Sequence, residues 1–170
     1  ARHEKMTITL SAKAGASTLS RGNMEMMDGA EFYDYYKSFQ NVEAVNFPRW
    51  NEDLRNSNFD WFKLAKKTGS TQDYNVTLNG GNEKMQSMFT MGYFKEEGAV
   101  KGYDLSRYST RIKVVYKPYE WLTIKPNLSG SRTTDTDRQY SVGAMYSMLP
   151  WDNPFDENGN PVPNQYEGWV

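Results

Sequence analysis

The stretch RYSTRIKVVYKPYEWLTIKPNLSGSRT, residues 107–133, decides the fold class of this chain. It contains two segments in which apolar and polar side chains alternate, joined by a short turn at residues 117–120. A period of two is the pattern of a β-strand with one apolar face. The apolar positions are Tyr108, Thr110, Ile112, Val114 and Tyr116 on the first segment and Leu122, Ile124 and Leu128 on the second. We therefore predict an antiparallel hairpin with strands at 107–116 and 121–131.

Three earlier segments have strand character as well. Met6–Ala14 and Asp73–Asn79 alternate in the same way, and the turn sequence GGNEK then leads into Met85–Phe94. Methionines at 85, 88 and 91 are spaced by three, as on a helix, but Gly92 and the β-favouring content of FTMGYF favour a strand. The sequence therefore predicts five strands, with the helical alternative open for the third.

The links between these strands alternate in length. Gly15–Thr71 is long and polar and contains one expected short helix, EFYDYYKSF, which Asp28 can cap with Glu31 three residues later. The rest of this region is expected to be ordered loop, and Lys95–Ser106 is expected to be a second long link. Pro118 falls in the turn before residue 121. Pro126 falls inside the last strand, where we expect a β-bulge because proline cannot donate to a ladder.

Composition excludes several classes of protein. The chain has 170 residues and a net charge of −1, which argues against a nucleic-acid binder. It has no cysteine and one histidine, His3, so it cannot assemble a cysteine zinc site or a histidine-based catalytic triad by itself. No run approaches the roughly 18 apolar residues of a membrane-spanning helix. No bond-making constellation is apparent, so we expect neither an enzyme nor a cofactor.

The apolar face could contact either a protein core or lipid. Tyr108 and Tyr116 bracket it, eight residues or about 26 Å apart along the strand. With a tilt of about 40° this spans roughly 20 Å of height, close to the ~25 Å apolar band between the aromatic girdles of a membrane barrel. The pattern favours a membrane barrel. A soluble, secreted β-sandwich that binds carbohydrate alternates in the same way and is the alternative.

Five strands alone cannot close a barrel in a membrane. Open edges in lipid would leave backbone groups unsatisfied, at several kcal/mol for each group. We therefore expect residues 1–170 to be a partial β-barrel domain of a larger chain.

Residues 73–131 resemble the early barrel segment of SusC-like TonB-dependent outer-membrane transporters. GGNEK (residues 80–84) through SRYSTR (residues 106–111) carries the most specific part of the resemblance. NFDWFKLAKKTGSTQ (58–72), EFYDYY (31–36) and NPFDENGNPV (153–162) resemble the approach to the barrel, a loop helix and a loop element of that family.

The resemblance implies an all-β, antiparallel transmembrane barrel of about 22 strands, of which this chain holds the first five, with long extracellular loops. It implies import of oligosaccharides or peptides together with a SusD-like surface lipoprotein. It also implies coupling to the TonB complex through a plug domain that this sequence does not contain, and a location in the outer membrane of a Gram-negative bacterium.

Candidate site residues follow from these patterns. Aromatic rings in the links could stack on a sugar or contact a lid, or could simply order the loops: Trp50, Trp61 and Trp151. Basic residues are expected to face the lumen or the plug: Arg107, Arg111, Lys113 and Lys125. Lipid-facing residues are expected to be Tyr108, Ile112, Val114, Tyr116, Leu122 and Ile124. Oxygen ligands at 152–158 are compatible with Ca²⁺, but their spacing is not that of an EF-hand, so we favour an acidic turn-rich loop and predict no metal site.

Overall fold

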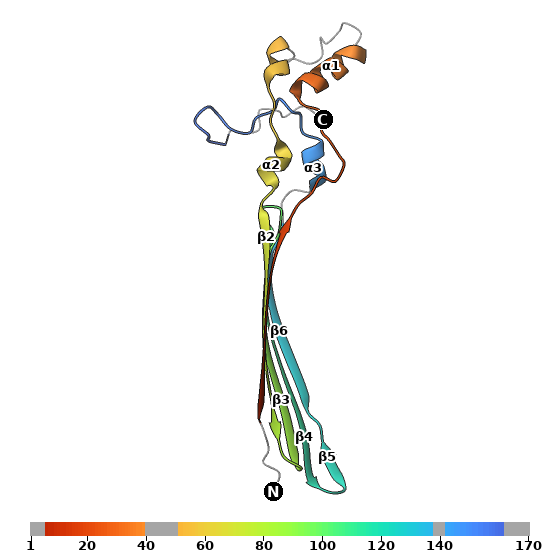
Figure 1. Ribbon diagram of the computed structural model, residues 1–170, viewed down its shortest axis with the longest axis vertical. Coiled ribbons are helices and arrows are strands. Elements are labelled where there is room, and N and C mark those ends of the chain that lie inside the picture. The colour runs from red at the N-terminus through yellow and green to blue at the C-terminus, as the bar shows by residue number, and fades with distance from the viewer. Residues whose placement is uncertain (1–5, 40–50, 138–141, 162–170) are drawn as a thin grey trace. The chain divides into compact units, whose positions relative to one another are not determined.

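One antiparallel sheet holds all the strands of the computed structural model, which describes residues 6–39, 51–137 and 142–161 (Figure 1). Each of the first four strands pairs with the next along the chain. The strands are β1 (Thr7–Thr18), β2 (Thr68–Gly81), β3 (Met85–Glu97), β4 (Asp104–Tyr119), β5 (Leu122–Ile124) and β6 (Asn127–Thr136). All five predicted strand locations are confirmed, and the fifth is divided into β5 and β6, which both pair with β4.

The sheet is open. Among the described residues β1 pairs only with β2, and β5 and β6 pair only with β4. No second sheet packs on it within these residues. The architecture is that of an open antiparallel sheet, consistent with part of a barrel, and in the described ranges it lacks the second layer that a β-sandwich needs.

The strands are longer than the sequence pattern predicts. β1 continues to Thr18 and β2 begins at Thr68, and these two residues are paired. β3 runs to Glu97 and β4 begins at Asp104, so the expected long link at 95–106 is wrong and shrinks to residues 98–103. The apolar alternation stops earlier because side chains on both faces become polar there, whereas the backbone pairing does not depend on side-chain polarity.

The irregularity of the hairpin lies near Pro118 in the turn, and not at Pro126 where the sequence predicts a bulge. The register of β4 with β5 shifts between Tyr116 and Tyr119, around Pro118. At Pro126 the register is unbroken, since Lys113 pairs with Asn127 and Tyr116 with Ile124. The Val114 N–H donates to the Pro126 carbonyl at 3.0 Å, and only the return bond from the missing proline N–H is lost. The bulge expected at Pro126 is therefore wrong, and the irregularity lies nearer the turn.

The links contain more helix than predicted. The expected helix is α1 (Gly29–Phe39), and its capping box is present: Glu31 N–H donates to Asp28 Oδ1 at 2.8 Å and Asp28 N–H to Glu31 Oε2 at 3.1 Å. The structure adds a 3₁₀ helix, η2 (Glu52–Asn56), and two short helices, α2 (Trp61–Ala65) and α3 (Val142–Tyr146). In the described ranges, no helix is both long enough and apolar enough to span a membrane.

The chain divides into two compact units. The sheet unit comprises Ala1–Leu19 and Lys66–Gln139, and the helical unit comprises Ser20–Ala65 and Tyr140–Val170. Buried hydrophobic side chains are concentrated in the helical unit, where Tyr33 and Trp151 form a cluster with Phe32, Leu54 and Leu149. In the described part of the sheet unit, Val100 is the one buried hydrophobic side chain. The sheet therefore has no core of its own.

Candidate functional site

The apolar face of the sheet carries large hydrophobic side chains in the open. The register places Tyr108, Ile112 and Tyr116 on the same face as Tyr93, Phe89 and Met85 of β3. The exposed large hydrophobic residues of this face are Ile8, Leu10, Tyr74, Val76, Met85, Met91, Tyr108, Ile112, Tyr116, Ile124 and Leu128. Leu10 is 74% exposed and Leu128 is 66% exposed. A contiguous apolar surface of this kind requires an apolar partner.

A row of three tyrosines crosses this face. Tyr74, Tyr93 and Tyr108 occupy paired positions on β2, β3 and β4. The rings of Tyr74 and Tyr93 are stacked with centroids 6.4 Å apart, and those of Tyr93 and Tyr108 lie 4.8 Å apart. We call these residues the tyrosine row. Toward the other end of the strands, Tyr119 and Trp121 stack at 5.7 Å beside the β4–β5 turn.

The six residues expected to face lipid lie on β4 and β5. Ile112 and Leu128 are paired at the middle of the apolar face, and Tyr116 pairs with Ile124 nearer the turn. Leu122 pairs with Tyr119 beyond the register shift. Four of the six residues expected to face lipid lie on β4 and share the apolar face, namely Tyr108, Ile112, Val114 and Tyr116.

The opposite face is polar. Three successive rows across five strands consist mostly of small or uncharged polar residues. Two cations, Arg111 and Lys113, lie on β4, and Met88 on β3 is the one large apolar residue of these rows. The rows are Ser11–Asn75–Gly92–Ser109–Ser131, Thr9–Thr77–Thr90–Arg111–Ser129 and Thr7–Asn79–Met88–Lys113–Asn127. Thr77 and Thr90 hydroxyls lie 3.2 Å apart. This surface can hydrogen-bond water or a polar partner over its whole width.

Three of the four basic residues expected to face the lumen lie on this polar face by the register, namely Arg107, Arg111 and Lys113, and Lys125 lies between β5 and β6. Arg107 lies with its guanidinium carbon 5.4 Å from the centroid of Phe94, its partner in the register. Arg111 lines a shallow depression of about 430 Å³ with hydroxyl-bearing neighbours that include Thr90, Ser109 and Ser129. Lys113 and Lys125 are exposed. The depression can accept a small polar or anionic group.

Two of the three candidate tryptophans, Trp61 and Trp151, are among the described residues of the helical unit. Trp61 is half-buried, donates from Nε1 to the Leu149 carbonyl at 3.0 Å, and meets Phe59 edge-on at 5.1 Å. Trp151 is 6% exposed and lies edge-on to Phe32 at 5.2 Å. Both rings order the loops by packing, and Trp50 lies outside the described residues.

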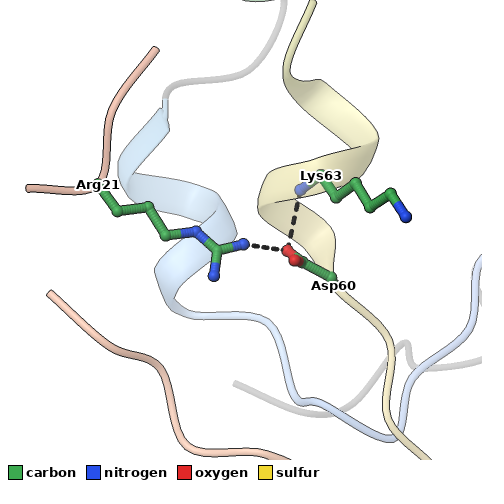
Figure 2. Close-up of polar contacts among 3 residues, drawn as sticks. All are labelled: Arg21, Asp60 and Lys63. Carbon is green, nitrogen blue, oxygen red and sulfur yellow. Dashed lines mark hydrogen bonds and ion pairs between the residues drawn. The ribbon is translucent and has the colours of Figure 1, made fainter.

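One polar cluster of the helical unit was not foreseen from the sequence (Figure 2). Asp60 precedes α2, and its Oδ1 accepts the N–H of Lys63 at 2.9 Å and a bond from the Arg21 guanidinium. The guanidinium also lies over the Phe62 ring, 4.4 Å from its centroid. Asp60 before an apolar helical run could have been recognised as an N-cap. Arg21, 39 residues away, could not.

The acidic loop forms a turn held by one carboxylate. Asp156 Oδ1 accepts the N–H groups of Asn158 and Asn160, both at 2.8 Å, and its Oδ2 accepts the Asn160 side-chain amide at 3.2 Å. The backbone and side-chain bonds from Asn160, supported by bonds from Asn158 and Gly159, lower the pKa of Asp156 below its ordinary value. Asp152 is buried. Across the described ranges no group of three or more acidic, histidine or cysteine side chains is arranged to hold a metal ion.

Comparison with known proteins identifies similar structures. No protein-family model matches the chain, and no curated protein sequence matches it. Solved structures of the RagAB peptide importer do match: the closed-closed state with a TM-score of 0.71 and the open-open state with 0.68, each at 24% identity over 93% of this chain. A further structure of the RagAB peptide transporter matches at 0.68.

The matched region is a small part of those proteins. This chain spans 22% of the length of the matched RagAB chain. The likeness shows that the open sheet and its linked helices have the fold of one segment of a peptide importer.

Proposed function

We propose that this chain is part of the barrel wall of a SusC-like, TonB-dependent importer in the bacterial outer membrane. The observation that carries the proposal is the division of one open sheet into two unlike faces. One is apolar, exposed and crossed by the tyrosine row, and the other consists mainly of hydroxyl, amide and charged side chains, with Met88 and Phe94 among its exceptions. A membrane barrel needs this arrangement, with apolar residues toward lipid and polar residues toward the lumen.

The cargo and partners follow from two sources. The fold is shared with an importer named for peptides, so we propose peptides as the first cargo class to test. Oligosaccharides remain the second class, from the sequence resemblance to SusC-like proteins. The same resemblance supports a SusD-like lipoprotein as the lid partner and the TonB complex as the energy source through a plug domain.

The faces of the sheet have different roles in this proposal. Tyr108, Ile112 and Val114 contact lipid, together with Tyr116, Leu122 and Ile124. Arg111 and Lys113, with Arg107 and Lys125, face the lumen and bind polar groups of the plug or cargo. Trp61 and Trp151 hold the loops of the links that contact the lid or cargo, and Trp50 is the candidate for direct contact.

Fractionation of the native cells tests the location. We expect the polypeptide that carries this sequence to be recovered in the outer-membrane fraction, to require detergent for extraction, and to be several times heavier than 19.7 kDa. Recovery of a soluble polypeptide near that mass would overturn the proposal and favour the β-sandwich alternative.

Uptake by a deletion strain tests the cargo. We expect loss of growth on a peptide mixture as the nitrogen source, restored by the full-length gene, and recovery of a lipoprotein when the tagged protein is purified in mild detergent. Loss of growth on an oligosaccharide with normal growth on peptides would reassign the cargo to glycans.

A further inference from the structure

Within the described part of the sheet, one arginine lies on the apolar face at the level of the tyrosine row. Arg132 on β6 pairs in register with Tyr108 on β4, which pairs in turn with Tyr93 on β3. Side chains at paired positions project from the same face of a sheet. Arg132 therefore continues the tyrosine row by one strand, and it is exposed.

Within the described residues the charge of Arg132 is not neutralised by a carboxylate. The other cation of this face near this level is Lys95, whose Nζ lies 2.7 Å from Glu97 Oε1. Glu97 is also within 3.9 Å of Lys67 Nζ, so this carboxylate is already shared. The next carboxylate on the face is Asp104, paired with Thr136, which is four residues or about 13 Å along β6 from Arg132.

The surface beside Arg132 is open. Gly130 precedes it by two residues on the same strand and face, and no atom lies within 4 Å of the position that a Cβ there would take. Gly130 pairs with Thr110, a small residue, whereas Val76 and Met91 fill the corresponding positions on β2 and β3. The aliphatic stem of Arg132 can therefore lie along the apolar face while its guanidinium reaches toward the polar border.

We propose that Arg132 and Tyr108 bind the phosphate group of a membrane lipid at the border of the apolar band. A guanidinium binds a phosphate through two parallel hydrogen bonds, which a lysine ammonium cannot reproduce. A tyrosine at headgroup level adds an O–H donor beside it. The inference rests on the proposed function, because it requires the apolar face to lie in a bilayer.

The test uses the full-length protein purified from its native membrane in a nonionic detergent. Phosphatidylglycerol is titrated into the micelles, and bound lipid is counted by native mass spectrometry. We expect Arg132→Gln to weaken lipid binding about five-fold, the effect of one cation near an anionic lipid surface, and Arg132→Lys to weaken it less. Lys13→Gln is the control, since Lys13 follows Ala12, the partner of Tyr74 in the register, and so lies on the opposite face.

Each outcome decides a different point. Equal lipid binding by wild type and Arg132→Gln would overturn the inference. The inference would also be overturned if inorganic phosphate alone, at the same concentration as the lipid, prevented phosphatidylglycerol from binding to the wild-type protein, because this would indicate a site for a soluble anion. A lower thermal stability of Arg132→Gln than of wild type in lipid-free detergent would overturn the inference as well, because it would indicate that Arg132 pairs with a protein carboxylate. Failure of every variant, wild type included, to bind phospholipid would overturn the proposed function itself.

Discussion

Tyr93 and Tyr108 lie opposite each other on β3 and β4, with ring centroids 4.8 Å apart and planes inclined by 41°. A one-residue slip of β4 would move Tyr108 to the other face and bring Arg107 onto the apolar one. The pair therefore shows that β3 and β4 are aligned so that the apolar side chains of both strands lie on one face of the sheet. It also marks the level at which the apolar alternation gives way to polar residues.

The contact between these rings should be measurable as a coupling energy. In a double-mutant cycle with Tyr93→Leu and Tyr108→Leu, we expect an interaction of about 0.5–1.5 kcal/mol, the range for aromatic pairs beyond their area burial. The measurement is urea unfolding of the full-length protein from lipid vesicles. Strictly additive single-variant effects would show that the two rings stabilise the protein independently.

A charge on the apolar face should cost most at its middle. Ile112 lies midway between Tyr108 and Tyr116, so Ile112→Lys should destabilise by about 2–4 kcal/mol, whereas Ile124→Lys near the turn should cost about 1 kcal/mol or less. Unfolding from vesicles gives both values. Thr9→Lys is the control, because Thr9 pairs with the uncharged Thr77 on the polar face. Equal costs at Ile112 and Ile124 would contradict a lipid-facing surface.

Two glycines of the sheet should respond in opposite ways to an added methyl group. A Cβ at Gly69 would lie 2.7 Å from the Glu97 carbonyl oxygen and 2.8 Å from the Ala99 nitrogen, both backbone atoms, so Gly69→Ala should cost about 1–3 kcal/mol. Gly130 has open space, so Gly130→Ala should be neutral or stabilise by about 0.4–1 kcal/mol. Thermal unfolding of the two variants side by side makes the comparison. The prediction fails if Gly69→Ala is as stable as wild type.

The cluster around Asp60 should contribute through the helix cap more than through the ion pair. Asp60→Ala removes the bond to the Lys63 N–H and should cost about 1 kcal/mol, whereas Asp60→Asn keeps an acceptor and should cost less. The pair with Arg21 is partly exposed, and a cycle with Arg21→Met should give a coupling of about 0.2–1 kcal/mol that weakens in salt. A larger effect of Arg21→Met than of Asp60→Ala would reverse this order.

The turn around Asp156 should loosen in acid. The carboxylate has a pKa below its ordinary value of 3.8 in the folded protein, so its stabilising effect is complete above that value and is lost as the pH falls through the lowered pKa. Hydrogen exchange of the segment 156–160, corrected for the intrinsic pH dependence, should show this step. Asp156→Asn cannot ionise, and its exchange profile should have no step. A step that persists in the variant would assign the transition to another group.

Alternation of residues was sufficient to locate the strands. Ile112 and Val114 against Arg111 and Lys113 identify a two-faced strand from the sequence, and the structure confirms it. The alternation could not locate the strand ends, because near Thr18, Thr68 and Glu97 neither side of the chain is apolar and the pattern has no contrast. Backbone pairing continues there without a side-chain signal.

The helices, like the strands, were predictable from the sequence only in part. The helix at Gly29–Phe39 was predictable because Asp28 and Glu31 form a local capping box. The short helices at Trp61–Ala65 and Val142–Tyr146 were not, because five residues are too few for a periodic pattern and isolated helices of this length are marginal in water.

By itself the sequence determined the strand locations, the two unlike faces and the tight turns, because each depends on the chemistry of neighbouring residues. Only the tertiary structure decided which residues share a row. That Arg132 continues the line of Tyr74, Tyr93 and Tyr108, or that Pro126 keeps the register while Pro118 lies at its break, depends on pairing between residues far apart in the chain. Register is set by the whole ladder of hydrogen bonds and cross-strand contacts, and the local composition of one strand is compatible with several alignments.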